Sequence, residues 1–95
     1  MSLFSDDARS DLDDIWNYLE ERRRGAGTDA LNAITSAASL LLMFPEAGRT
    51  GRVDGTREKV VARTPYLLVY VVGDDGAPSV LRVLHGRRRW PPSRD

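Results

Sequence analysis

Apolar residues recur every three or four positions through the first half of the chain, which is the spacing of one face of an α-helix. The first run follows Ser5, a residue type that caps helices, and ends at a Gly-Ala-Gly segment that breaks it. The second run follows Thr28, another candidate cap, and ends at Pro45, because the residue before proline avoids helical geometry. Since the link is short, we expect an antiparallel helix hairpin over about residues 5–44. The predicted buried positions are Ala8, Leu12, Ile15, Trp16 and Leu19 in the first helix and Leu31, Ile34, Ala38, Leu41 and Leu42 in the second.

The second half of the chain changes to a β-strand pattern. Residues 45–56 are rich in glycine and poor in large apolar side chains, which predicts a loop. Three β-rich runs follow at 57–63, 66–72 and 79–85, joined by a Thr-Pro link and a Gly-Asp-Asp-Gly turn. The middle run is nearly all apolar, as in a central strand, and Tyr66 and Tyr70 on one of its faces are predicted core residues. The N-terminal residues up to Phe4 are candidates for a short edge strand.

Together these patterns predict a single α+β domain over residues 1–95. We expect the helix hairpin to pack on one face of a three- to four-stranded, mainly antiparallel and curved sheet at about 57–85, followed by a C-terminal tail at 86–95. Hydrophobic residues make up 41% of the chain, which is enough for one compact core. The longest apolar run is far shorter than the roughly 20 residues of a membrane span, and no export signal opens the chain, so we expect a cytoplasmic protein without membrane contact.

The net charge of zero conceals an uneven distribution. Residues 1–47 carry four arginines against nine acids, a net charge of −5, whereas residues 48–95 carry ten basic residues against five acids, a net charge of +5. Arg57, Lys59 and Arg63 alternate along the first predicted strand and therefore share one of its faces. If the helices cover the opposite face, these residues form an open basic surface. The candidate surface cations are Arg49, Arg52, Arg57, Lys59, Arg63, Arg82, Arg87, Arg88 and Arg89.

Three interpretations of these cations stay open at this point. The planar guanidinium fork can bind two oxygens of a phosphate or carboxylate, which favours a binding site. The same charges can be solvated and keep exposed strands from pairing edge to edge. The third interpretation is that they dock an acidic protein segment.

The composition excludes several classes of catalytic and metal-binding site. The chain has no cysteine, which excludes disulfides, cysteine-ligated zinc and thiol catalysis. His85 is the only histidine and the acids do not converge on it, so we predict neither a metal nor a cofactor. His85 is either a proton shuttle or a hydrogen-bonded structural residue. Trp90 either anchors the chain end or is exposed for a partner.

Five blocks of sequence, taken together, resemble the RelE/ParE toxin superfamily. They are DLDDIWNY at 11–18, FPEAGR at 44–49, GTRE at 55–58, YLLVY at 66–70 and LRVLHGRR at 81–88, and the resemblance extends from about Phe4 to Pro91. It implies a helix hairpin on a small antiparallel sheet, in agreement with the periodicity. It also implies the toxin of a type II toxin–antitoxin system, held inactive in a hetero-oligomer with a cognate antitoxin of the ParD or RelB type.

The superfamily contains two activities. RelE-like members cleave mRNA on the ribosome without a metal, whereas ParE-like members bind DNA gyrase. Ribonuclease-type members usually place an arginine where this chain has Leu67, lysines where the apolar run 60–62 lies, and a tyrosine where it has Trp90. These departures favour a gyrase-binding toxin that is not an enzyme, with the basic residues named above and Trp90 binding the target or the antitoxin.

Two alternatives accompany this hypothesis. In a metal-independent endoribonuclease acting on mRNA at the ribosome, His85, Arg82, Arg88 and Trp90 would serve as acid, clamp and stacking platform. In an interaction module that has lost toxicity, none of these residues would act on a target.

Overall fold

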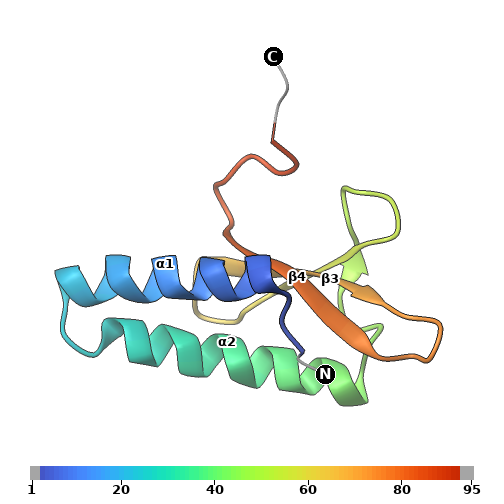
Figure 1. The fold of residues 1–95 in the computed structure, drawn as a ribbon, viewed down its shortest axis with the longest axis horizontal. Coiled ribbons are helices and arrows are strands. Elements are labelled where there is room, and N and C mark those ends of the chain that lie inside the picture. The colour runs from blue at the N-terminus through green and yellow to red at the C-terminus, as the bar shows by residue number, and fades with distance from the viewer. Residues whose placement is uncertain (1–2, 93–95) are drawn as a thin grey trace.

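The computed structural model describes residues 3–92 and consists of a helix hairpin followed by a β-sheet. The elements are α1 (Asp6–Arg22), α2 (Ala26–Met43), β1 (Arg49–Thr50), β2 (Arg57–Val60), β3 (Tyr66–Val72) and β4 (Pro78–His85). All neighbouring strands are antiparallel and their order in the sheet is β1-β2-β3-β4. The two helices run side by side, and the α1–α2 link and the β3–β4 turn lie at opposite ends of the molecule (Figure 1). The predicted α+β architecture is confirmed.

The start of α1 follows the sequence prediction. The Ser5 hydroxyl accepts a hydrogen bond from the Ala8 backbone N–H at 3.1 Å. Asp6 and Asp7 lie in the first turn, at the positive end of the helix dipole, and Arg22 lies in the last turn, at its negative end. Both interactions are stabilising.

The start of α2 differs from the prediction, because the helix begins at Ala26 and Thr28 is not its cap. The Glu20 carboxylate of α1 accepts hydrogen bonds from the backbone N–H groups of Gly25 at 2.9 Å and Gly27 at 2.7 Å. These hydrogen bonds hold the pKa of Glu20 below its usual range, and the bond from Gly25 has the largest effect. Thr28 instead accepts a hydrogen bond from Trp16 Nε1 at 3.4 Å. A side chain of one helix therefore caps the other.

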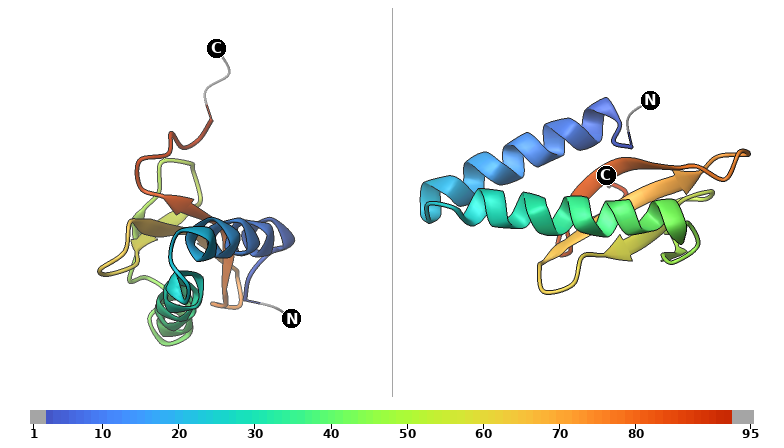
Figure 2. Two further views of the ribbon diagram at one scale, coloured as in Figure 1. Left: turned by 90° about the vertical axis from the view of Figure 1, so that its left-hand side faces the viewer. Right: turned by 90° about the horizontal axis from the view of Figure 1, so that it is seen from below.

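The main core lies between the helix hairpin and one face of the sheet (Figure 2). Ile34 and Leu41 of α2 and Leu68 and Tyr70 of β3 are completely buried in it. The Tyr70 hydroxyl donates to the carbonyl of Pro45 at 2.7 Å and accepts from the backbone N–H at position 48 at 2.9 Å. The tyrosine thus fixes the connector that leaves α2, and the predicted burial of both β3 tyrosines is confirmed.

Two residues predicted on buried helix faces are exposed instead. Trp16 is 38% exposed and Leu42 is 60% exposed. Each helix contacts the rest of the protein along one narrow face, because only the sheet and the other helix lie against it. Residues at the margin of the apolar pattern therefore face solvent.

A second, smaller cluster covers the opposite face of the sheet, which we call the outer face. Leu67, Val69 and Leu84 form it, and Trp90 from the C-terminal tail packs against it. The middle strand β3 is consequently buried on both sides over Tyr66–Tyr70, which accounts for its nearly continuous apolar sequence.

The edge of the sheet at β4 is closed by the N-terminal part of the chain. Val80 donates its N–H to Leu3 at 2.8 Å and accepts from the N–H of Ser5 at 2.9 Å, and Ser5 Oγ donates to the carbonyl of Leu81 at 2.9 Å. The predicted N-terminal edge strand is reduced to a single parallel bridge between Phe4 and Val80, and positions 1–2 lie outside the described residues. The fourth strand is β1, within the connector that was predicted to be a loop.

Candidate target-binding surface

Arg82 of β4 is tied to α1 by a partly buried ion pair. Its Nε and Nη2 atoms donate to the two oxygens of Asp11 at 2.7 and 3.0 Å, and the backbone N–H of Val83 donates to the same carboxylate at 2.9 Å. Asp11 is only 9% exposed. The hydrogen bonds that Arg82 donates to Asp11 raise the pKa of Arg82 above its usual range. This arginine holds α1 against the edge of the sheet and is not available to a partner.

A second buried carboxylate holds two more of the candidate cations. Glu58 is 2% exposed and accepts from Arg49 Nη2 at 3.1 Å and from the backbone N–H of Arg52 at 3.0 Å, while Arg52 Nε lies 3.5 Å away. Burial alone raises the pKa of Glu58, but the hydrogen bonds from Arg52 and Arg49 outweigh it and hold the pKa below the usual range. These arginines fasten the connector to the outer face of the sheet.

The prediction of an open basic face opposite the helices is wrong. Arg57 pairs across the strands with Tyr70 and Lys59 pairs with Leu68, and both partners belong to the core beneath the helices. Directly opposed residues of an antiparallel pair point to the same side, so these cations lie at the helix side of the sheet. Arg57 Nη1 donates to the carbonyl of Gly48 at 2.8 Å and therefore supports the connector.

Arg63 is separated from the other two by the end of its strand. The strand β2 ends at Val60, and Arg63 lies in the following turn with a left-handed backbone φ of 63°. It is exposed and has no ion pair among residues 3–92.

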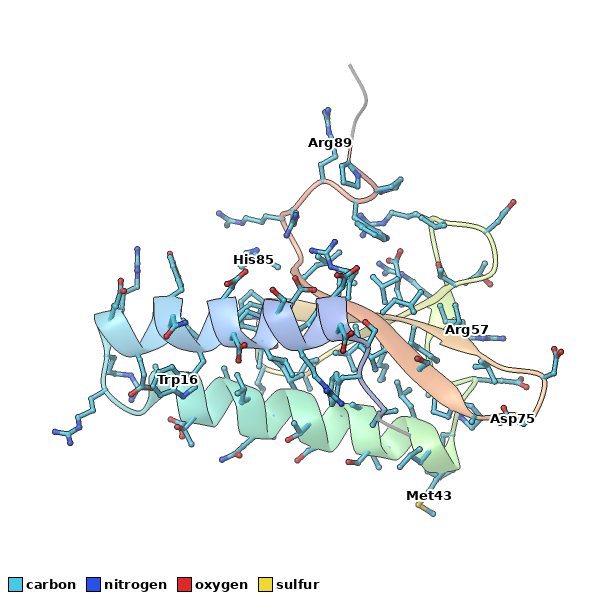
Figure 3. The ribbon with its side chains drawn as sticks, in the orientation of Figure 1. Trp16, Met43, Arg57, Asp75, His85 and Arg89 are labelled. Atoms are coloured by element: carbon cyan, nitrogen blue, oxygen red, sulfur yellow. The ribbon has the colours of Figure 1, made fainter. Side chains whose placement is uncertain are left out.

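A group of three exposed arginines lies just after β4, in residues 86–89, which we call the Gly86 turn. Its backbone is fixed: Gly86 donates to the carbonyl of Pro65 at 2.6 Å, Arg88 to the carbonyl of His85 at 2.9 Å, and Arg87 to His85 Nδ1 at 3.1 Å. The three arginines are exposed and form no ion pair with any residue between 3 and 92. Arg89 points away from the helices and the sheet (Figure 3).

Trp90 anchors the end of this turn. Its ring packs on the outer-face cluster, its carbonyl accepts from Arg52 Nη1 at 3.4 Å, and the guanidinium carbon of Arg82 lies 5.7 Å from the ring centroid. The indole Nε1 is buried without a hydrogen-bond partner in the described part of the chain. Of the two interpretations of Trp90, the structure supports the one in which it anchors the chain end.

A groove of about 450 Å³ separates α1 from the start of β3 and the end of β4. His85 meets Tyr66 edge to face there, with ring centroids 5.9 Å apart. Burial raises the pKa of the Tyr66 hydroxyl, and nearby Tyr18 adds to the shift. Because His85 Nδ1 accepts the N–H of Arg87, the neutral ring carries its proton on Nε2. The groove is lined by Asp11, Asp14, Ile15, Tyr18, Leu19, Pro65, Tyr66, Val83, His85 and Arg88.

The four residues predicted for a ribonuclease site are not brought together. His85 and Arg88 line the groove, whereas Arg82 is bound to Asp11 and Trp90 packs on the outer-face cluster. Among residues 3–92, no group of three histidine or acidic side chains is placed to hold a metal ion. No helix in that range is long and apolar enough to cross a membrane.

Sequence reasoning missed an exposed apolar stripe at the end of α2. Leu40, Met43 and Phe44 are 55%, 74% and 58% exposed, and Met43 points away from the body of the molecule (Figure 3). Leu40 and Met43 are three residues apart on α2 and therefore lie near one another on its surface, apart from buried Leu41. Phe44 follows directly as the C-cap, and its N–H donates to the carbonyl of Leu40 at 2.9 Å. The signal was present in the sequence, because these residues continue the apolar run past the one face that the core can cover.

Comparison with known proteins gives concordant matches. The family model described as "ParE toxin of type II toxin-antitoxin system, parDE" matches residues 3–90. The curated protein "Putative toxin Y4kP" of Sinorhizobium fredii strain NGR234 is 35% identical over 80 residues, covering 84% of this chain and 81% of that protein. A solved structure described as "Chromosomal ParDE TA system from P. aeruginosa" superposes with a TM-score of 0.77 at 22% identity, over 86% of this chain and 90% of that chain.

Proposed function

Because the chain belongs to the ParE toxin family of type II toxin–antitoxin systems, we propose that it stops growth by binding DNA gyrase and that it does so without catalysis. A ParE toxin has a cognate antitoxin as its partner, and that antitoxin holds this toxin inactive. The Gly86 turn is the part of the surface that contacts the target. Arg87, Arg88 and Arg89 supply the charge, and Trp90 holds the turn in place.

The observation that supports this proposal is the division among the cations. Arg49, Arg52 and Arg82 are bound to buried carboxylates. The arginines of the Gly86 turn have no such partner between residues 3 and 92, so their full charge is available to another molecule. Exposed charges on a rigid turn favour specific and rapid association.

The endoribonuclease is the competing hypothesis, and the groove beside His85 is the observation in its favour. His85 and Arg88 face the same space as Tyr66, so an acid and a cation would be present. The clamp and the stacking platform would be missing, because Arg82 and Trp90 are engaged elsewhere. Loss of such charge stabilisation typically costs about 10²–10³ in rate, which makes binding the better-supported function.

A gyrase supercoiling assay tests the proposal, run beside an in vitro translation reaction. The purified toxin should block supercoiling of relaxed plasmid or trap cleaved DNA, and exchanging the three arginines of the turn for glutamine should abolish the effect. The variant His85→Ala should retain inhibition. Full supercoiling at a large excess of toxin, together with codon-internal cuts in translated mRNA that vanish in His85→Ala, would establish the ribonuclease instead.

We propose that the antitoxin covers the exposed stripe of Leu40, Met43 and Phe44 with an apolar helix. The β4 edge is closed by residues 3–5 and by Asp11, so it is not free to pair with an antitoxin strand. The open part of the sheet is the end of β2, since β1 pairs only with Arg57 and Glu58 and leaves Val60 54% exposed. An antitoxin segment can extend the sheet there.

Calorimetric titration of the antitoxin tests this surface. The variants Leu40→Glu and Met43→Glu should weaken binding by about tenfold or more, because each buries a charge in an apolar contact. Thr35→Glu is the matched control, since this residue is exposed on the same helix outside the stripe. Equal affinity of all three variants and the unaltered toxin would place the antitoxin elsewhere.

A further inference from the structure

The chain contains two runs of three consecutive arginines, and the structure places them in opposite electrostatic settings. Arg22–Arg24 ends α1, and Arg87–Arg89 forms the Gly86 turn. We propose that the Gly86 turn binds the phosphate backbone of a nucleic acid, and that duplex DNA is the form it binds best. The choice of DNA rests on the proposed function, because gyrase would present DNA to the toxin. The binding itself does not require gyrase.

The run at the end of α1 is largely compensated. Arg23 pairs with Asp29 at 3.4 Å, and Arg22 donates to the carbonyl of Tyr18 at 3.4 Å and stacks over its ring at 3.7 Å. Glu20 and Glu21 precede the run in the sequence. Three acids within residues 20–29 therefore balance the three arginines.

The run in the Gly86 turn is not compensated. Residues 83–92 contain no acid. Two carboxylates line the groove beside Arg88: Asp11 is already bound to Arg82, and Asp14 forms no ion pair with the turn among residues 3–92. The backbone of the turn is fixed by three hydrogen bonds before any ligand arrives. Binding an anion there requires no further ordering of the backbone, which removes one part of the usual cost of association.

The surroundings favour a phosphate backbone over an acidic protein. A specific protein interface has an apolar centre, usually aromatic. The turn itself presents no such centre, because Trp90 is turned onto the outer-face cluster. The apolar side chains nearby, Ile15, Tyr18 and Leu19, belong to α1 and line the groove that only Arg88 of the three arginines borders. Contacts to a phosphate backbone need only cations, and consecutive arginines suit its repeating charges, since each guanidinium fork can bind two phosphate oxygens.

Binding of the toxin to a labelled 20-base-pair DNA duplex, followed by fluorescence anisotropy, tests the inference. Each phosphate contact contributes about −0.9 to the slope of log affinity against log salt, so three contacts predict a slope of about −2.7. Raising the salt fourfold, from about 50 to about 200 mM, should then lower the affinity by about 40-fold. The variant Arg87→Gln/Arg88→Gln/Arg89→Gln should lose most of the binding and most of this salt dependence.

The chain supplies a matched control in Arg22→Gln/Arg23→Gln/Arg24→Gln, which removes the same charge from the other run. This variant should bind DNA with the same slope as the unaltered toxin. An equal loss of binding in both variants would show attraction by net charge alone and would overturn the inference, as would the absence of binding at 50 mM salt. Circular dichroism melting of both variants establishes that each is folded.

Two competitors identify the partner. An RNA duplex of the same sequence should compete more weakly than the DNA duplex. Stronger competition by RNA would overturn the preference for DNA but would support phosphate binding by the turn. Polyglutamate that competes as well as DNA at equal charge would assign the turn to an acidic protein and overturn the inference. Because gyrase is absent from these measurements, a failure of DNA binding is distinct from a failure of supercoiling inhibition.

Discussion

The arginines bound to Glu58 and Asp11 and those on the Gly86 turn belong to the same basic half of the chain but differ in what they contact. Arg49, Arg52 and Arg82 reach carboxylates that are almost completely buried, and through them they fasten the connector and α1 to the sheet. The three arginines that follow β4 contact no carboxylate among residues 3–92. The residue type is the same in both regions, so it does not distinguish a structural cation from one that is available for binding.

What separates the two regions is the position of two acids. Asp11 lies on the buried side of α1, and Glu58 lies on the outer face of β2 while its neighbours in the sequence face the helices. A carboxylate in a buried position must be paired, because an isolated buried charge costs several kcal/mol. Each such acid therefore engages the nearest arginines. Four variants test this difference between the two regions, and they follow in order of decreasing expected effect on stability.

Removal of Asp11 should have the largest effect. Asp11→Ala leaves the half-buried guanidinium of Arg82 and the backbone N–H of Val83 without their acceptor. We expect a loss of about 3–5 kcal/mol in the free energy of unfolding, measured by urea titration. Asp13→Ala, an exposed change on the same helix, should alter stability by less than about 0.5 kcal/mol. Similar values for the two variants would mean that the ion pair is not structural.

Replacement of Glu58 should have a smaller and pH-dependent effect. Glu58→Gln weakens charge-assisted hydrogen bonds, each worth about 1.5–3 kcal/mol, but its arginine partners remain largely solvated, so we expect a loss of about 2 kcal/mol at neutral pH. The pKa of Glu58 is lowered in the folded state, so the unfolded chain binds the proton more readily and stability rises with pH.

The sign of that shift defines the pH test. The difference between the unaltered protein and Glu58→Gln should be complete above the ordinary glutamate pKa of about 4.3 and should shrink as the pH falls through the lowered value. Urea titrations at several pH values measure it. A difference that grew on acidification would contradict the assignment of Glu58 as the charged partner.

Truncation of Trp90 should release the turn at modest cost. Trp90→Ala removes a half-buried ring from the outer-face cluster, so we expect a loss of about 1–2 kcal/mol, below the 3–5 kcal/mol of a fully buried aromatic. Trypsin should cleave after the arginines of the turn faster in this variant. Trp90→Phe keeps an aromatic ring and deletes the indole N–H that has no described partner, so it should behave closer to the unaltered protein. Unchanged cleavage in Trp90→Ala would mean that the ring does not anchor the turn.

Exchange of Arg87, Arg88 and Arg89 for glutamine should have the smallest effect on stability. Their side chains are exposed and unpaired within the described chain, so the free energy of unfolding should change by less than about 0.5 kcal/mol. The midpoint of urea unfolding measures this. A loss above about 1 kcal/mol would place these residues with the structural arginines and remove the contrast.

The fold was predictable because its strongest signals are local. The periodicity after Ser5 predicts α1, and the apolar run at 66–72 predicts a central strand, since both patterns depend only on spacing. The start of α2 was placed three residues late because its cap, Glu20, comes from the preceding helix. The strand β1 was missed because two residues carry no alternation and pair only after β2 is in position.

The candidate site was predictable in composition but not in arrangement. The chain itself fixes its charges, its lack of cysteine, its helix and strand periods, and the motifs of its toxin family, because each of these depends on neighbouring residues. Strand register decided which way Arg57 and Lys59 face, and packing decided that Asp11 and Glu58 engage other arginines. These contacts join residues up to 71 positions apart. Only the folded chain brings such residues within bonding distance, and a charge becomes structural or available according to what it meets there.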